Sequence, residues 1–249
     1  MRAMVLAAGL GTRLRPLTDD RPKALVEIGG RTLLDITLAR LRAIGIHEVI
    51  INAHHFADQL IGYLQANKLF GMQIEVSRED VLLDTGGGLK RAAHFFLNDS
   101  SDEPFLVHNV DVLSTIDLEL MLRTHRAHKG LATLAVMQRK TSRYLLFENS
   151  LLCGRRLERD GEPRTELVRP AGHSQALAFC GIHVMAPRLL QLLTEDGAFS
   201  IIDAYLRLAA CDQRIQAFRA DEYYWRDLGR PENIAQAEQD IVRGLISLR

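Results

Sequence analysis

A stretch near the N-terminus combines flexible backbone with concentrated positive charge. Gly9 and Gly11 interrupt an apolar run that begins at Met4. Glycine lets a ligand approach the main chain closely because it has no Cβ. Arg13 and Lys23 follow within the next residues. Turn amides together with fixed cationic charges suit phosphate oxygens. The stretch therefore predicts a cradle for a polyphosphate.

The residues expected to line this cradle are small or polar and surround the two glycines. They are Ala8, Gly9, Gly11, Thr12, Arg13 and Lys23. Two better-known glycine loops are excluded: a dinucleotide fingerprint needs glycine where Leu14 stands, and a P-loop needs Gly-Lys-Ser/Thr, which is absent. A tight turn with solvated arginines is the structural alternative. The cluster of cations favours binding.

The same stretch resembles the signature of a known family. Leu6-Ala-Ala-Gly-x-Gly-Thr-Arg-Leu-x-Pro16, followed by Pro22-Lys23, is similar to the motif of the sugar-1-phosphate nucleotidylyltransferases, the enzymes that make nucleotide sugars. The resemblance runs nearly the whole length of the chain. It implies a glycosyltransferase-A-like fold and a catalytic role for Arg13, Lys23 and Asp111.

Asp111 is the first candidate ligand for a metal ion. It ends the apolar segment 104–112, and the two-residue period of a strand puts Asn109 and Asp111 on one face, where parallel strands end and ligands bind. The family has an acidic metal ligand at this place, and a subgroup has an asparagine that touches the sugar. Val110 stands where the family usually has glycine. An aspartate that caps a turn is the alternative.

Asp227 is the second candidate metal ligand. Trp225-Arg-Asp-Leu-Gly229 is similar to the family's Trp-x-Asp-x-Gly segment, whose aspartate completes the metal site from a distant part of the chain. Anionic substrates about 4 Å apart repel by roughly 4 kcal/mol at an effective dielectric constant of 20. Mg²⁺ held by carboxylates and phosphate oxygens offsets this repulsion. The resemblance thus implies Mg²⁺ on Asp111 and Asp227. The alternative for Asp227 is a structural role, in which Asp227 and Arg230 prepare the start of the last helix.

A second glycine-rich segment, Asp84-Thr-Gly-Gly-Gly-Leu89, is a candidate site for the nucleobase. Glycines at a helix start let main-chain groups lie flat against a base, which assigns Asp84, Gly86 and Gly87 to the nucleotide. The segment is similar to the Glu-Thr-Gly-Gly-Gly of N-acetylmuramate-1-phosphate uridylyltransferases. A flexible loop is the alternative.

Two later segments are candidates for the sugar. Phe179 to Met185 resembles the family segment in which a glycine, here Gly181, lies near the sugar, and a buried strand is its alternative. The family often has Phe-x-Glu-Lys-Pro before it, whose lysine binds the sugar phosphate. Leu167-Val-Arg-Pro170 is the nearest match, so Arg169 is the candidate cation, although the glutamate is missing. This departure from the family's Phe-x-Glu-Lys-Pro segment favours the short uridylyltransferase-like subgroup.

Apolar periodicity predicts the elements that position these residues. Strands are expected near 4–8 and at 48–53, 72–77, 104–112, 131–137, 176–185 and 214–220, and helices at 33–44, 56–69, 89–97, 117–128, 200–210 and from 231. Their alternation predicts an α/β fold, a Rossmann-like three-layer α/β/α sandwich with a mostly parallel mixed sheet. Segment 139–173 is polar and is expected to be irregular apart from short hairpins that roof the site.

Composition limits the partners of the chain. Lys+Arg and Asp+Glu number 31 each, so no net charge favours nucleic acid or a membrane. Three widely spaced cysteines, 153, 180 and 211, predict buried, reduced thiols, without disulfides or zinc. His125-x-x-His128 and His54-His55 lack a third zinc ligand. The chain opens directly in a strand, with no leader or membrane-spanning run, which predicts a cytoplasmic protein.

These observations lead to one expected activity. A single domain, with 1–112 for the nucleotide and 113–249 for the sugar phosphate, is expected to join a nucleoside triphosphate to a sugar 1-phosphate with Mg²⁺ and release pyrophosphate. UTP with N-acetylmuramate 1-phosphate is the favoured pair. Guanylyl or thymidylyl transfer to mannose, glucose or heptose 1-phosphate, cytidylyl transfer to phosphocholine, and a non-catalytic nucleotide-sugar sensor remain open. The chain is expected to be a monomer or small homo-oligomer.

Overall fold

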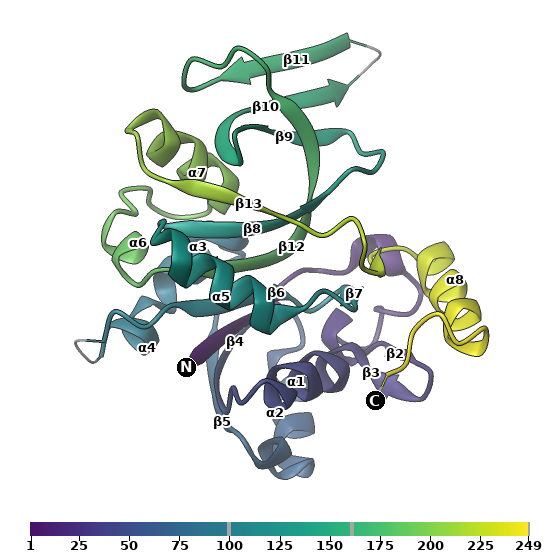
Figure 1. The fold of residues 1–249 in the computed structure, drawn as a ribbon. Coiled ribbons are helices and arrows are strands. Elements are labelled where there is room, and N and C mark those ends of the chain that lie inside the picture. Colours follow the sequence, from purple (N-terminus) through teal and green to yellow (C-terminus); the bar gives the residue numbers. More distant parts are fainter. Residues whose placement is uncertain (99–100, 160–161, 249) are drawn as a thin grey trace.

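The computed structural model describes residues 1–98, 101–159 and 162–248. One large sheet runs through it (Figure 1). Its strands are β1 (Arg2–Leu6), β4 (Glu48–Ala53), β5 (Gln73–Arg78), β6 (Phe105–Asn109), β8 (Ala132–Met137), β9 (Arg143–Glu148), β10 (Leu151–Arg159), β11 (Glu162–Leu167), β12 (Gln175–Met185) and β13 (Ile215–Arg219). The order is β11-β10-β13-β8-β12-β6-β1-β4-β5, with β9 paired to β10 and β12.

Smaller elements complete the fold. Two short two-stranded sheets pair β2 (Glu27–Ile28) with β3 (Arg31–Thr32) and β7 (Val112–Ser114) with β14 (Trp225–Asp227). The helices are α1 (Leu33–Ala43), α2 (Ala57–Ala66), α3 (Asp84–Arg91), α4 (Ala93–Leu97), α5 (Leu118–His128), α6 (Arg188–Gln191), α7 (Ile201–Ala210) and α8 (Pro231–Val242), with 3₁₀ turns η1 (Thr12–Leu14), η2 (Lys23–Leu25) and η3 (Lys68–Gly71).

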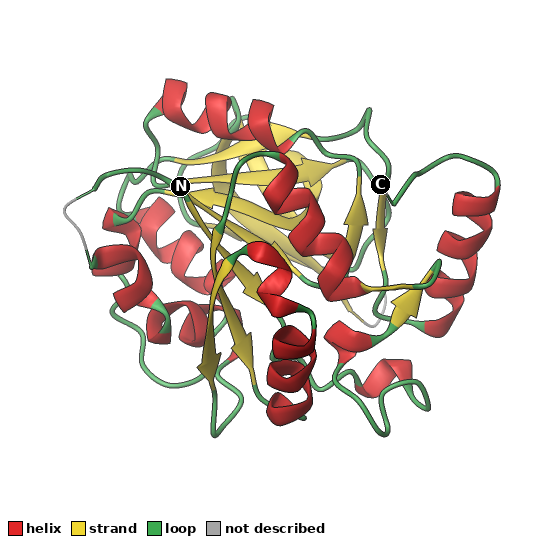
Figure 2. Ribbon diagram, turned by 90° about the horizontal axis from the view of Figure 1, so that it is seen from below, coloured by secondary structure: helices red, strands yellow, loops and turns green. Residues whose placement is uncertain are grey.

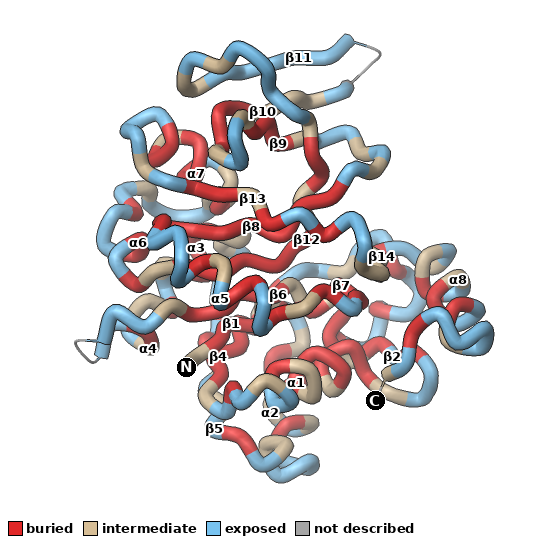
Figure 3. Tube along the Cα trace, in the orientation of Figure 1, coloured by how far each residue is buried: buried red, intermediate tan, exposed pale blue. Residues whose placement is uncertain are grey.

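Two hydrophobic cores lie on opposite faces of the sheet. Successive residues of β1 alternate between them: Ala3 and Val5 join the core that contains residues of α1, α2 and α5, whereas Met4 joins the core that contains residues of α3, α4 and α7. Helices therefore cover both faces (Figure 2). The central strands are buried and β11 is exposed (Figure 3). The predicted three-layer α/β/α sandwich with a mixed sheet is confirmed.

The sheet is less parallel than the sequence suggested. Strands β6, β1, β4 and β5 run parallel, as do β8 and β13, but the other described pairings of this sheet are antiparallel. Segment 139–173 is less irregular than expected, because it forms β9, β10 and β11, which extend the sheet. Hairpin pairing there was predicted correctly.

Most predicted helices are found, with one shift of physical interest. Helix α3 begins at Asp84 and includes Gly86, Gly87 and Gly88, although the sequence predicted a helix only from Leu89. Helix α2 ends at Ala66 and continues as η3. No described helix has the length and apolar character needed to cross a membrane. The cysteines are free, and Cys211 is exposed against expectation.

Candidate active site

A cavity of about 450 Å³ opens at the carboxyl ends of β1 and β6. Most of its lining residues lie at or just after the ends of these two strands, or just before and at the start of α3. Others come from η2, β4 and the segment before α7. The lining residues are Leu6, Ala7, Ala8, Gly9, Lys23, Asn52, Leu82, Asp84, Thr85, Asn109, Val110, Asp111 and Ala198. None of the described residues of segment 139–173 lines this cavity, so that segment does not form its roof.

Lys23 and Asp111 meet at one wall of the cavity. Lys23 begins the 3₁₀ turn η2, and its Nζ donates a hydrogen bond to Asp111 Oδ2. The side chains are only 10% and 20% exposed, so the two charges compensate each other in a partly dehydrated place. The cation expected from Pro22-Lys23 therefore lies at the carboxylate expected from the end of β6.

A short ladder brings Asp227 beside Asp111. In the antiparallel pairing of β14 with β7, Asp227 is the partner of Val112. The amide of Leu228 donates to the carbonyl oxygen of Asp111 at 2.8 Å. The amide of Gly229 donates to Asp227 Oδ1 at 2.5 Å, which fixes the carboxylate. The two predicted metal ligands are thus neighbours in space although far apart in sequence.

The position of Gly229 marks where the charges converge. A Cβ atom at Gly229 would lie 2.6 Å from Asp227 Oδ1, 2.7 Å from Arg13 Nη2 and 3.3 Å from Lys23 Nζ. Three charged groups therefore surround one point beside Asp111. A side chain at this position would require these charged groups to shift.

The donor set at this place fits a magnesium ion that is partly held by substrate. Among the described residues no group of three or more His, Cys, Asp or Glu side chains could hold a metal. Two carboxylates with phosphate oxygens and water are a usual Mg²⁺ environment, whereas a dedicated structural metal site needs more protein ligands. Asp111 and Asp227 can supply the protein's share.

Asn109 and Gly181 meet at the next wall. Gly181 has a left-handed φ of +74°, and a Cβ there would lie 2.9 Å from both Asn109 Nδ2 and Val112 Cγ2. Asn109 Oδ1 is buried and has no hydrogen-bond partner among the described residues. An unsatisfied buried acceptor is costly, so this oxygen suits a hydroxyl or amide donor of a substrate.

The glycines of α3 do not face the cavity. The amide of Gly86 donates to the carbonyl oxygen of Phe199 at 2.9 Å. A Cβ at Gly86 would overlap the Phe199 ring, and one at Gly87 would overlap the Gly197 carbonyl. These glycines let α3 pack tightly on segment 197–199. Asp84 and Thr85 line the cavity, whereas Gly86 and Gly87 do not, and the predicted main-chain contact of these glycines with the base stays a prediction.

Asp84 adopts an unusual backbone conformation. Its φ is +57°, which is uncommon for a residue with a Cβ. Its Oδ1 accepts a hydrogen bond from the amide of Thr85 at 2.6 Å. Thr85 Oγ1 accepts in turn from the amide of Ile201 at 3.0 Å, so the start of α3 is tied to α7.

The buried pair Asn52 and Glu79 supports the cavity and was not predicted. Asn52 Oδ1 accepts from the amide of Ala7 at 2.7 Å, and Asn52 Nδ2 donates to Glu79 Oε1 at 2.7 Å. Glu79 Oε2 accepts from the amide of Leu83 at 3.0 Å. The pair thereby joins the first glycine loop to the segment before α3. Asn52 at the end of the apolar run 49–51 was the available sequence signal.

Arg169 lies away from the cavity, contrary to its predicted role at the sugar phosphate. Its Nε donates to the carbonyl oxygen of Ala209 at 3.1 Å, and its Nη2 donates to that of Gln213 at 3.1 Å. These carbonyls lie at and beyond the end of α7, and a ten-residue helix separates its two ends by about 15 Å. Arg169 therefore caps α7.

The remaining cradle residues have distinct places. Gly11 precedes η1 in a left-handed conformation, with φ +67°, and its carbonyl oxygen accepts from Thr18 Oγ1 at 2.8 Å. Thr12 is exposed. Neither lines the cavity, whereas Ala8 and Gly9 do.

His108 is excluded as a proton acceptor in the cavity. Burial, and after it the nearby Arg40 guanidinium, lowers its pKa to about 3. Its Nδ1 lies 2.8 Å from the carbonyl oxygen of Asn109. The imidazole is thus a packed, neutral group beneath the strand end.

Comparison with known proteins agrees with this geometry. A family model described as nucleotidyl transferase matches residues 2–244. The chain is 36% identical to N-acetylmuramate alpha-1-phosphate uridylyltransferase of Caulobacter vibrioides over 95% of each chain. It is 30% identical to mannose-1-phosphate guanylyltransferase of Mycobacterium tuberculosis, over 98% of this chain and 65% of that protein.

Solved structures share the fold. HddC from Yersinia pseudotuberculosis in complex with GMP-PN superposes with a TM-score of 0.74 at 20% identity, covering 96% of this chain and 99% of the other. A UDP-glucose pyrophosphorylase in complex with UDP-glucose gives a TM-score of 0.76 at 18% identity, covering 98% of both chains. The predicted glycosyltransferase-A-like fold is confirmed. By its sequence matches, the chain belongs to the sugar-1-phosphate nucleotidyltransferases of the nucleotidyl transferase family.

Proposed function

We propose that this cavity catalyses Mg²⁺-dependent transfer of a nucleotidyl group to a sugar 1-phosphate. The observation that carries the proposal is the convergence of Arg13, Lys23 and Asp227 around the space at Gly229, with Asp111 bound to Lys23. Two cations and two carboxylates at one place can accept a triphosphate with its counter-ion. A site that only senses a nucleotide sugar would not need both carboxylates.

The proposed roles follow from the position of each group. Arg13 and Lys23 bind phosphate oxygens of the triphosphate, and the glycine loop at Ala8 and Gly9 gives the phosphates access to main-chain amides. Asp84 and Thr85 lie where the nucleoside would bind. Asn109 Oδ1 accepts a hydrogen bond from the sugar, beside Gly181. This assignment keeps residues 1–112 as the nucleotide half and gives residues 113–249 the rest of the sugar site.

The proposed chemistry needs no covalent enzyme intermediate. An oxygen of the sugar 1-phosphate attacks the α-phosphorus of the triphosphate, the bond to the β-phosphate breaks, and pyrophosphate leaves. Mg²⁺ on Asp111 and Asp227 would supply charge neutralisation and orientation. The attacking phosphate is already ionised at neutral pH, so no side chain has to remove a proton. The chain's own contribution is positioning and electrostatic stabilisation.

We propose UTP and N-acetylmuramate 1-phosphate as the substrates, in the cytoplasm. The relative from Caulobacter vibrioides, which spans nearly the same length, supports this pair. The segment Asp84-Thr-Gly-Gly-Gly88 supports it as well, through its similarity to that group of enzymes. Mannose 1-phosphate with GTP is the alternative that the Mycobacterium tuberculosis relative supports.

Pyrophosphate release over a grid of triphosphates and sugar 1-phosphates tests the proposal. We expect turnover with UTP and N-acetylmuramate 1-phosphate, loss of turnover with a chelator, and recovery on addition of Mg²⁺. Turnover only with another pair would correct the substrates. Absence of turnover with every pair, for a folded protein that binds nucleotide sugars, would favour a sensor.

A further inference from the structure

A second cavity has a volume of about 430 Å³. Strands β9, β10 and β12 and the start of α7 form its walls. Its lining residues include Arg139, Tyr144, Leu145, Phe179, Ser200 and Ile202. Ala198 lines the first cavity and Ser200 lines the second, so the chain passes directly from one to the other.

The strand directions place Arg139 and Asp111 at the same edge of the sheet. Both β6 and β8 pair antiparallel with β12, so β6 and β8 run in the same direction and end at the same edge of the sheet. Asp111 follows the end of β6 by two residues, and Arg139 follows the end of β8 by two residues. Strand β12 lies between β6 and β8, which are therefore about 10 Å apart across the sheet, and the Arg139 guanidinium reaches the carbonyl oxygen of Phe179 on β12. That interval suits a sugar whose phosphate lies near Asp111.

Arg139 is held firmly and forms no ion pair with a described carboxylate, although the more distant Asp227 carboxylate acts on it electrostatically. Its Nη2 donates to the carbonyl oxygen of Phe179 at 2.9 Å, and its guanidinium lies 3.9 Å over the Trp225 ring. Trp225 is two residues before Asp227 on β14, so the stack borders the predicted metal ligand. Arg139 Nε is buried and has no hydrogen-bond partner in the described part of the chain. Burial lowers the pKa of this guanidinium.

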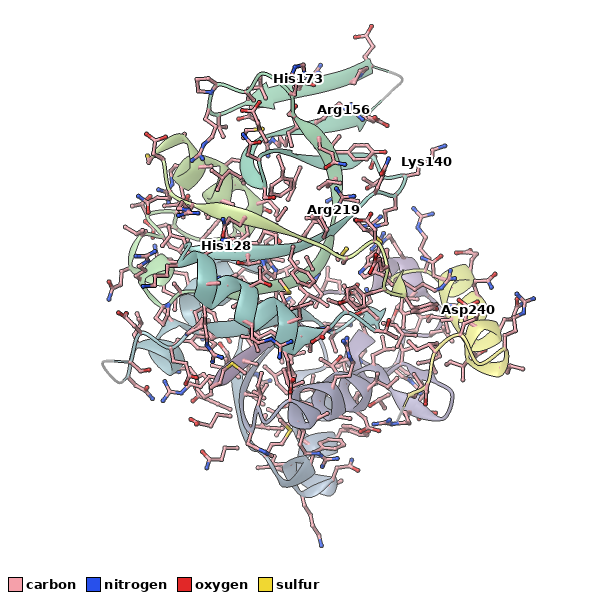
Figure 4. The ribbon with its side chains drawn as sticks, viewed as in Figure 1. His128, Lys140, Arg156, His173, Arg219 and Asp240 are labelled. Atoms are coloured by element: carbon pink, nitrogen blue, oxygen red, sulfur yellow. The ribbon has the colours of Figure 1, made fainter. Side chains whose placement is uncertain are left out.

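The neighbouring Arg155 shows the contrast. Its Nε pairs with Glu166 Oε2 at 2.7 Å and its Nη1 pairs with Asp203 Oδ1 at 2.5 Å. For Arg139 no ion pair with a described carboxylate is found within the usual distance. Lys140, next in the chain, is exposed at the same end of the molecule as Arg156 (Figure 4). Arg139 is therefore a half-buried cation that lines the second cavity without an ion pair to a described carboxylate.

We propose that Arg139 binds a carboxylate carried by the sugar ring of the substrate and thereby selects acidic sugar 1-phosphates. This inference rests on the proposed function. A guanidinium and a carboxylate form a planar, charge-assisted pair, and the pair compensates a charge that a neutral sugar would leave buried and unmatched. The aromatic ring of Trp225 fixes the plane of the guanidinium before the substrate binds.

Two sugar phosphates that differ by the carboxylate test this role. N-acetylmuramate 1-phosphate carries a lactyl carboxylate that N-acetylglucosamine 1-phosphate lacks. We expect Arg139→Gln to lower kcat/KM for the acidic sugar roughly 10- to 100-fold while kcat/KM for the neutral sugar changes less than about threefold. Arg139→Lys keeps the charge but loses the planar guanidinium with its two parallel donors. Its kcat/KM for the acidic sugar should lie between those of the wild type and Arg139→Gln.

The controls separate recognition from structure. Arg164→Gln removes an exposed arginine of β11 outside both cavities and should leave both kcat/KM values unchanged. Equal losses of kcat/KM for both sugars in Arg139→Gln would mean that Arg139 only supports the fold. Unchanged kcat/KM for both sugars would also overturn the inference. In either case the proposed function stands. If the wild type turns over neither sugar with any triphosphate, the proposed function fails first, and the inference fails with it.

Discussion

Lys23 and Asp111 form an ion pair although 88 positions separate them in the chain. The pair lies where the turn after the glycine loop meets the end of β6, and Asp227 lies directly beside it through the β7–β14 ladder. Lys23 can compensate Asp111 in the free protein and can turn to phosphate oxygens when a cation binds the carboxylate. The pair is therefore the place where the electrostatics of the proposed reaction can be tested.

Asp111→Asn should lower turnover with little effect on the fold. Loss of one preorganised electrostatic group costs about 10²–10³ in kcat. Loss of a charged hydrogen bond costs about 1.5–3 kcal/mol of stability, against a usual total of about 5–15 kcal/mol, so the variant should stay folded. Pyrophosphate release and circular dichroism measure the two effects. Asp58→Asn, which breaks an exposed ion pair on α2, is the control, and full activity of Asp111→Asn would reject the metal role.

Gly229→Ala should impair activity through a single methyl group. The added Cβ would press on Asp227 Oδ1 and Arg13 Nη2, and a shift of about 1 Å in a catalytic group can cost on the order of 100-fold. Gly62→Ala provides the comparison, because a Cβ there meets nothing within 4 Å and should raise helix stability by up to about 1 kcal/mol. Steady-state kinetics with thermal melts would reveal the difference. Equal activity of both variants would show that these groups can move aside without cost.

Arg169→Ala should affect stability and spare catalysis. The guanidinium caps carbonyls at the end of α7, and loss of such charged hydrogen bonds costs about 1.5–3 kcal/mol. Tm should fall by about 2–4 °C for each kcal/mol in a chain of this size. KM for the sugar 1-phosphate is the decisive measurement. A large rise in KM without a fall in Tm would return Arg169 to the sugar phosphate.

Stability should fall with pH below neutrality because of buried histidines. Burial lowers the pKa of His125 from 6.5 to about 4, and burial lowers those of His108 and His183 to about 3. Below about pH 6.5 the unfolded chain therefore binds protons at these histidines that the folded chain does not bind. The free energy of unfolding decreases as the pH falls from about 6.5 to the folded-state pKa values. Each group contributes up to about 1.4 kcal/mol per pH unit in that window.

Urea unfolding at several pH values tests this expectation. His125→Gln, which can keep a hydrogen bond to Thr133, should flatten the dependence between about pH 6.5 and 4. The exposed His173 provides the matched substitution, His173→Gln (Figure 4). If the free energy of unfolding of His125→Gln depended on pH as steeply as that of the wild type, His125 would have the same pKa in the folded and unfolded chain.

The amino-acid sequence determined the main features of the candidate site because their causes are local. Glycine spacing predicted the close approach to main chain at Gly9, and the two-residue period of an apolar run placed Asn109 and Asp111 at the exposed end of a strand. The local cluster of cations indicated Arg13 and Lys23, and the family resemblance added Asp227; the roles of these residues remain predictions. Alternating periodicity was enough for the three-layer fold.

Only the tertiary structure decided which distant groups meet. Register between β7 and β14 brings Asp227 to Asp111, and two antiparallel pairings with β12 bring Arg139 to the same edge of the sheet. The tertiary structure also packs Gly86 against Phe199 and places the Arg169 guanidinium at the end of α7. Sequence periodicity specifies the face and the end of an element, but the order of strands and the neighbours of a helix depend on contacts between residues far apart in the chain.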